Sequence, residues 1–192
     1  AQWISNPDSV EARGAEYSPY LGYNYPDRVF FGDTHLHTSY STDAGMIGNV
    51  LGPDEAYRFA KGEIVTASSG VRARLLRPLD WLVVADHAEN LGLANLIAES
   101  DSELLKNDWG REVHDMVKAG EWDDAYAAWG DQMAAREDPL AGNEDLTRTM
   151  WERLTQAAED PSGPGRFPAL VGYEASSSPL GNNLHRNVIF RD

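Results

Sequence analysis

The stretch Arg28-Val-Phe-Phe-Gly-Asp-Thr-His-Leu-His-Thr38 places two histidines directly after a run of aromatic and β-branched residues. Residues 28–33 favour a β-strand that leads into a polar segment. Because side chains alternate along a strand, Asp33, His35 and His37 are expected to share one face, within roughly 7 Å of each neighbour. Two imidazoles on one face can bind the same metal ion.

A second strand is expected over residues 79–85, which are apolar enough to be buried on both faces between layers of helices. It ends at Asp86-His87-Ala88-Glu89, a second group of side chains of the kind that bind metals. Between the two strands, residues 53–61 carry helical signals, with proline first, acidic residues in the first turn and glycine after the end. A strand, a helix and a buried strand in this order indicate an α/β fold.

The remaining chain divides into an arm, an insertion and two more strands. Residues 1–27 lack sustained periodicity and are expected to form an extended arm on the domain of residues 28–192. Residues 91–160 predict a helical insertion that is rich in tryptophan and covers another part of the protein. After a loop at 161–165, strands are expected at 167–173 and 184–190. The helical signal is clearest where apolar residues recur every four positions, at Leu146, Met150, Leu154 and Ala158.

The composition excludes several classes of function. The 31 acidic residues outnumber the 16 basic ones, which gives a net charge of −15, so nucleic acid and anionic membranes are not expected partners. The chain has no cysteine, which leaves only His, Asp and Glu to bind a metal. It has no apolar run long enough for a membrane span. It begins Ala1-Gln2 without Met, as a processed secretory protein or a trimmed chain would, and a periplasmic or secreted location is favoured over the cytoplasm.

Polar side chains lie at an end of each expected strand. Glu174 comes directly after an apolar run, and a buried carboxylate needs a partner such as a metal ion. Because the carboxyl ends of parallel strands converge on one face, these side chains are expected to meet in one cleft. A set of oxygen and nitrogen ligands without thiolate suits Zn, Mn or Fe. The candidate ligands are His35, His37, His87, Glu174 and His185.

Each of these residues also has a structural alternative. The two histidines of the first motif could form a hydrogen-bonded surface pair, and Asp86 could cap the helix that follows it. His185 could be a hydrogen-bonded core residue. His114 lies in an acidic helical pattern and is interpreted as a solvated helix residue.

Taken together, the motifs resemble those of the PHP (polymerase and histidinol phosphatase) superfamily of metal-dependent phosphoesterases. More narrowly, residues 31–38, 77–89 and 183–192 resemble its PHP-like branch, long catalogued as a domain of unknown function. The resemblance covers residues 28–192. It implies the α/β class and the N-terminal part of a distorted (β/α)7 barrel, a TIM-like barrel, with the helical insertion at about 91–160.

The resemblance also implies roles for single residues. His35, His37 and Glu174 would bind a first ion, and Glu174 would bridge to a second ion bound with His185. Asp43 stands where many members have a histidine, and with His87 it would form a third site, so two or three divalent ions are expected. The family pattern continues with another His and an Asp-x-His motif, so a C-terminal remainder of the same protein, possibly a separate chain, is expected to complete the site.

The function implied is a metal-dependent hydrolase that acts on a small anionic phosphate ester, with sulfate esters or phosphotriesters as further substrates. A hydroxide bridging a binuclear metal centre would attack phosphorus or sulfur. Glu174 and Asp86 are the candidate catalytic carboxylates. Arg186 is the candidate cation for the developing charge, with a surface salt bridge as its alternative.

Two other classes stay open. The same ligands could form a non-catalytic structural or regulatory metal-binding domain, whose site would be closed to water. An amidohydrolase-type barrel also begins with His-x-His but would need a bridging lysine. The chain offers Lys61, Lys106 and Lys118, none at an expected strand end.

Overall fold

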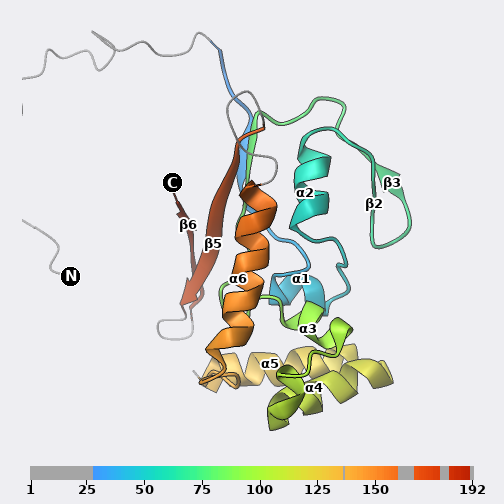
Figure 1. Cartoon of the computed structure of the whole chain (residues 1–192), viewed down its shortest axis with the longest axis vertical. Helices are drawn as coiled ribbons and strands as arrows, with labels where there is room; N and C mark the ends of the chain where they lie inside the picture. The colour runs from blue at the N-terminus through green and yellow to red at the C-terminus, as the bar shows by residue number, and fades with distance from the viewer. Residues whose placement is uncertain (1–27, 136, 160–166, 178–181, 191–192) are drawn as a thin grey trace, which may run out of the picture.

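The computed structural model describes residues 28–135, 137–159, 167–177 and 182–190. The expected arm at 1–27 and loop at 161–165 lie outside these residues. The described chain is mixed α/β, with a curled half-barrel sheet, a small second sheet and six α-helices (Figure 1). The expected α/β class is therefore confirmed.

The main sheet has the strand order β1 (Gly32–Leu36), β4 (Trp81–Val84), β5 (Ala169–Ser177) and β6 (Leu184–Ile189). Strands β1, β4 and β5 are parallel, whereas β6 is antiparallel to β5. The parallel arrangement from which the meeting of the side chains was expected does not extend to β6, because β5 and β6 are consecutive along the chain and pair as a hairpin does. The start of β6 therefore lies at the edge where β1, β4 and β5 end.

The curl of the sheet is visible in one contact between its two outer strands. Asn187 of β6 donates from Nδ2 to the backbone oxygen of Thr34 in β1, at 2.7 Å. In a flat sheet these strands would be separated by two others, at roughly 4.8 Å per strand. The hydrogen bond is possible only because β6 bends back across the open face of the sheet.

The first strand begins later than the sequence pattern suggests. Val29, Phe30 and Phe31 are exposed and precede β1, which starts at Gly32. The partner strand explains the difference, since β4 starts at Trp81 and pairs that residue with Gly32. Residues 28–31 therefore precede the paired strands, and Phe31 is connected to them by its backbone oxygen, which accepts from the N–H of Asp80 at 2.7 Å.

The described residues form the helices α1, α2, α3, α4, α5 and α6 and one short 3₁₀ turn. The helix expected at 53–61 is present and the segment expected to be helical at 91–160 contains four helices, whereas α1 and the small antiparallel hairpin of β2 and β3 were not expected. No helix of the described residues is both long enough and apolar enough to cross a membrane. The bounds are Thr42–Met46, Pro53–Ala60, Leu93–Glu99, Asp108–Ala119, Trp122–Ala135 and Glu144–Glu159 for the helices, Leu104–Lys106 for the turn, and Val65–Thr66 and Arg72–Ala73 for β2 and β3.

Two helices cover the outer face of the sheet. Helix α6 packs on β5, and α2 packs on β4. The expected four-residue repeat of α6 is buried as predicted, since Leu146, Met150, Leu154 and Ala158 all belong to the core. On the sheet side, Leu82 and Val84 of β4 complete this layer.

The other helices of the insertion lie beyond the carboxyl ends of the parallel strands, beside α1 (Figure 1). One tryptophan connects them to the sheet, because Trp129 of α5 donates from Nε1 to Asn90 Oδ1 at 3.0 Å. Asn90 in turn donates to Asp138 at 3.0 Å. The insertion is thereby attached to the loop that follows β4 and carries His87.

Candidate metal centre

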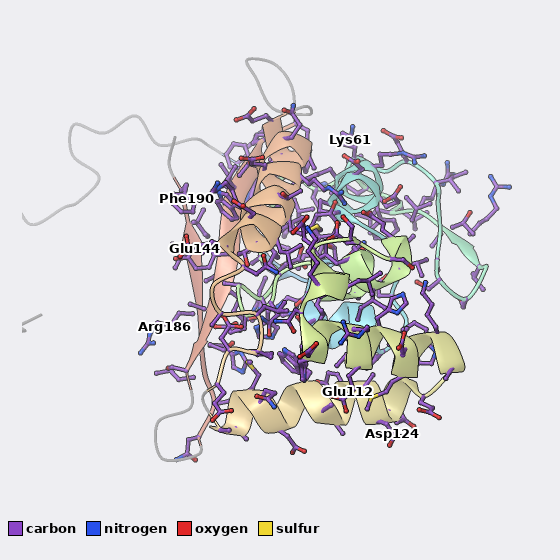
Figure 2. All side chains as sticks on the ribbon, turned by 60° about the horizontal axis from the view of Figure 1, so that its bottom comes forward. Lys61, Glu112, Asp124, Glu144, Arg186 and Phe190 are labelled. Carbon is purple, nitrogen blue, oxygen red and sulfur yellow. The ribbon has the colours of Figure 1, made fainter. Side chains whose placement is uncertain are left out.

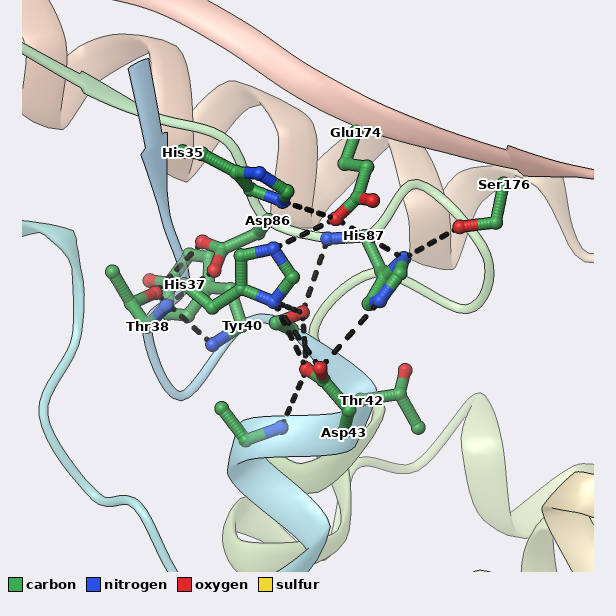
Figure 3. A network of polar contacts seen from close by, with 12 residues as sticks. His35, His37, Thr38, Tyr40, Thr42, Asp43, Asp86, His87, Glu174 and Ser176 are labelled. Atoms are coloured by element: carbon green, nitrogen blue, oxygen red, sulfur yellow. Dashed lines mark hydrogen bonds and ion pairs between the residues drawn. The ribbon is translucent and has the colours of Figure 1, made fainter. Parts of the chain in front are cut away.

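Four imidazole rings lie in a row at the carboxyl edge of the parallel strands, and three of them are drawn in Figure 3. Neighbouring ring centroids are 5.0 Å apart for His35 and His37, 4.8 Å for His37 and His87, and 5.5 Å for His87 and His185. The first two rings come from β1 and the turn after it, the third follows β4, and the last is near the start of β6. The antiparallel direction of β6 explains how a residue at the beginning of a strand reaches this edge.

The carboxylate of Glu174 lies in the middle of this row. It projects from within β5 rather than from its end, and its side chain is 0% exposed. Its Oε2 lies 3.0 Å from His35 Nε2 and 2.7 Å from His37 Nε2, while Oε1 contacts His185 Nδ1. The nearest atom of His87, Nδ1, is 3.7 Å away. One carboxylate therefore faces all four rings.

Two atoms at the centre of the cluster are buried without a hydrogen-bond partner among the described residues. They are Glu174 Oε1 and His37 Nε2. Buried polar atoms are nearly always satisfied, and a carboxylate oxygen beside ring nitrogens without hydrogen-bonding geometry is the arrangement that surrounds a cation. The residues present thus fit a metal ion.

Three overlapping groups of side chains have the spacing of a metal site, with ligand atoms within 4.8 Å of one another in each. All three groups offer only nitrogen and carboxylate oxygen, a set suited to Zn, Mn or Fe. Every metal ligand expected from the sequence belongs to at least one of them. The groups are His35, His37 and Glu174; His37, Asp43 and His87; and His87, Glu174 and His185.

Asp43 lies on the other side of the row from Glu174 (Figure 3). It sits in the first turn of α1, with Oδ1 3.2 Å from His37 Nδ1 and Oδ2 3.5 Å from His87 Nε2. Asp43 Oδ1 also accepts hydrogen bonds from Ser41 Oγ at 2.7 Å and from the backbone N–H of Ala44 at 2.6 Å. The rings of His37 and His87 are thus each held between two carboxylates.

Without an ion, protons balance the carboxylates of the cluster. Burial lowers the pKa of His87, but the contacts with the carboxylates of Asp43 and Glu89 and the charge of Glu174 outweigh it and raise the pKa to about 10. The hydrogen bond to Asp43 raises the pKa of His37, against the effect of burial. Burial raises the pKa of Asp43, and the pairs with His37 and His87 more than reverse this, so the pKa is held well below its usual range. Metal binding therefore has to displace protons.

Asp86, expected to be a catalytic carboxylate, belongs to none of the three groups of possible ligands. It is fully buried, and it accepts hydrogen bonds from Thr38 N at 2.5 Å and Thr38 Oγ1 at 2.7 Å (Figure 3). Burial raises its pKa to about 6, although both hydrogen bonds from Thr38 act in the opposite direction. Asp86 joins the end of β4 to the turn after His37.

Two further expectations are not met by the geometry. Arg186 is adjacent to His185 on β6, so its side chain is on the opposite face of the strand, and Figure 2 shows it pointing outward from the molecule. Asp33 is exposed and accepts a hydrogen bond from the backbone N–H of His35 at 2.8 Å. An irregularity in the pairing of β1 between Asp33 and Leu36 interrupts the simple alternation that the sequence suggested.

Ser176 is a polar residue of the site that the sequence reasoning missed. Its Oγ lies 3.0 Å from His87 Nδ1 and 3.1 Å from His185 Nδ1, and its backbone N–H donates to Glu89 Oε1 at 2.9 Å. Since it follows Glu174 by two positions on one strand, the alternation of side chains could have placed it on the same face. Through the hydrogen bond from Ser176, the Glu89 side chain connects the loop after β4 to the backbone of β5 beside His87.

His114 lies apart from this cluster, on α4. Its Nε2 is 3.0 Å from Ser100 Oγ and its Nδ1 is 2.9 Å from Asp115 Oδ1, the order of a catalytic triad. An oxyanion hole would need N–H groups beside the serine. Those of Ser100 and Asp101 already donate to Ile97 and Leu96 at the end of α3. We interpret this group as a helix-end contact.

The fold and the site define a mixed α/β protein with a histidine and carboxylate cluster at the carboxyl edge of a curled sheet. The chain belongs to the family described as "Protein of unknown function (DUF3604)", whose model matches residues 24–192. No curated protein and no solved structure matches the chain.

Proposed function

We propose that the protein is a metal-dependent hydrolase of phosphate esters, related to the PHP superfamily. The observation that carries the proposal is the buried Glu174 carboxylate, whose two oxygens face different imidazoles. A carboxylate in this position can join two ions, as hydrolases with two metal ions require. The curled half-barrel sheet is compatible with the first part of a distorted (β/α)7 barrel.

Two groups of ligands would hold the ions, and no histidine would belong to both groups. His35 and His37 would bind one ion with Glu174, and His87 and His185 would bind the other with the same carboxylate. When bound, the two ions would supply Lewis-acid chemistry, polarising the ester oxygens and lowering the pKa of a water molecule.

The exposure of the cluster favours a catalytic site over the structural alternative. The side chains at the two ends of the row, His35 and His185, are 49% and 40% exposed, whereas Glu174 between them is inaccessible. A structural metal site is enclosed by its ligands, but a catalytic one must leave a coordination position accessible to water and substrate. This row of candidate ligands is accessible to solvent at both of its ends.

The charge of the site affects whether an anionic substrate can approach it. Asp43, Glu89 and Glu174 all contact the histidines, and the protein carries a net charge of −15. An anionic ester would be repelled from this surface unless bound cations neutralise the carboxylates. Since Arg186 points away, the exposed imidazoles of His35 and His185 are the groups among the described residues of this cluster that are placed to approach a substrate.

The amidohydrolase alternative finds no support in the lysines. Lys61 follows α2 and lies 3.4 Å from Glu63, Lys106 is in the 3₁₀ turn, and Lys118 is near the end of α4. None of the three belongs to an element that carries a candidate ligand, so none can bridge ions at Glu174.

The test combines metal analysis of the purified protein with a panel of nitrophenyl phosphate monoesters, diesters and triesters and nitrophenyl sulfate. We expect about two divalent ions per chain and turnover that a chelator abolishes and added Zn²⁺ or Mn²⁺ restores. Glu174→Gln should lose an ion and lower turnover by at least about 100-fold, because removing part of the metal machinery forfeits several kcal/mol of transition-state stabilisation. Glu112→Gln, an exposed position on α4, is the matched control. Bound metal without turnover on any ester would favour the structural alternative.

A further inference from the structure

We propose that Asp43 is a positioning residue rather than a metal ligand, and that it fixes which nitrogen of His37 and of His87 is presented to the ions. The inference rests on the proposed function, because it assumes two ions joined by Glu174. It removes the third ion that the sequence motifs suggested.

Asp43 contacts the nitrogen of each ring that is turned away from Glu174. On His37, Nδ1 faces Asp43 at 3.2 Å while Nε2 lies 2.7 Å from Glu174. On His87 the nitrogens are reversed, with Nε2 3.5 Å from Asp43 and Nδ1 3.7 Å from Glu174. Nδ1 also lies 3.5 Å from Glu89 Oε2 and 3.0 Å from Ser176 Oγ, and an ion at this nitrogen would replace both contacts. A neutral imidazole binds a metal through one nitrogen and donates the proton of the other, and a carboxylate at the protonated nitrogen fixes that choice.

A third ion would compete with the other two for ligands. A metal bound by His37, Asp43 and His87 would need the far nitrogen of each ring. Each ring would then have to lose the proton on its far nitrogen and bind one ion at each nitrogen, or it would have to stop binding the ion at Glu174. With the rings assigned to Glu174, two ions keep three ligands each from this cluster, which is the number that catalytic zinc sites use.

The surroundings of Asp43 also hold its carboxylate in a fixed position, from which it can accept hydrogen bonds from the two rings. Its Oδ1 already accepts hydrogen bonds from Ser41 Oγ and the Ala44 backbone N–H, at 2.7 and 2.6 Å. Ser41 is fully buried, and its Oγ accepts a hydrogen bond from the backbone N–H of His87 at 3.1 Å. The carboxylate is therefore held in place by the first turn of α1, and its oxygens can orient two rings at once.

The first test measures binding of Zn²⁺ by competition with a chromophoric chelator, together with the ion content at saturation. Wild-type protein should hold two ions, and Asp43→Asn should also hold two but bind them about 10- to 100-fold more weakly, the usual effect of losing a partner to a ligating histidine. Asp54→Asn, an exposed acidic position on α2, should bind as the wild type does. Three ions in the wild type and two in Asp43→Asn would overturn the inference, and so would unchanged affinity.

The second test needs no variant. Nitrogen-15 NMR of the Zn²⁺-loaded wild type should show opposite tautomers, with the proton on Nδ1 of His37 and on Nε2 of His87. Metal on either of these nitrogens would overturn the inference while leaving the proposed hydrolase intact, provided that the phosphate esters are turned over. Failure of the wild type to bind any ion would overturn both proposals.

Discussion

Asp86→Asn tests whether a buried carboxylate supports the turn that carries His37. The variant keeps the size of the side chain but leaves one acceptor oxygen where the native residue accepts from both Thr38 N and Thr38 Oγ1. A hydrogen bond to a charged group contributes about 1.5–3 kcal/mol, and part of that loss is offset because the variant no longer buries a charge. We expect a net loss of about 1–2 kcal/mol in the free energy of unfolding.

In a chain of this size each kcal/mol shifts the midpoint of thermal unfolding by about 2–4 °C, so the expected decrease is about 2–8 °C. Calorimetry in the presence of a chelator measures it without a contribution from bound metal. Asp108→Asn is the control, because this carboxylate is 94% exposed and its pair with Arg111 contributes about 0–1 kcal/mol. A melting temperature of Asp86→Asn equal to that of the control would refute the reasoning.

Three further outcomes are expected. Gly92→Ala should destabilise the protein by about 2–4 kcal/mol in a denaturant titration, because Gly92 has a φ of +76° and a Cβ there would lie 2.3 Å from Met150 Cε. Gly120→Ala is the control, since Gly120 has a φ of +88° but a Cβ there would meet no atom within 4 Å. This variant should lower the free energy of unfolding by only about 1–2 kcal/mol. For the chelated protein, the folded-state pKa of His87 of about 10 exceeds its ordinary value of 6.5, so its contribution to stability is complete below about pH 6.5 and is lost as the pH rises towards 10. The melting temperature should accordingly fall from pH 7 to pH 10, and a flat or rising profile would contradict this. In steady-state kinetics, Glu174→Gln should lower turnover more than Asp43→Asn, and equal rates would contradict the central place of Glu174.

Much of the fold could be predicted because its signals are local. The apolar run of β4, the capping residues of α2 and the four-residue repeat of α6 each specify an element without reference to the rest of the chain. The start of β1 could not be predicted in this way, since Phe30 and Phe31 have strand-like composition but lie beyond the end of the partner strand. Strand direction is likewise a property of the pair, which is why the antiparallel β6 was missed.

The residues that gather in this cluster could be predicted because few residue types bind metals without cysteine, and those residues lie at the ends of apolar runs. That they bind a metal stays a prediction. What the sequence does not encode locally is where each side chain turns. Asp86 and His87 are neighbours, yet the carboxylate faces Thr38 while the ring faces Glu174. Arg186 likewise lies on the opposite face of β6 from His185. The direction in which each of these side chains points depends on how the strands pair in the completed sheet.

The contact between His35 and Glu174 joins residues 139 positions apart, with the whole helical insertion between them. Closing so long a loop costs conformational entropy before the contact can form, so we expect this cluster to assemble late in folding. An ion that recognises this assembly stabilises the native state but has little to bind in the folding transition state. A metal ion bound to this cluster would then mainly slow unfolding, extending the lifetime of the folded protein while leaving the rate at which it folds almost unchanged.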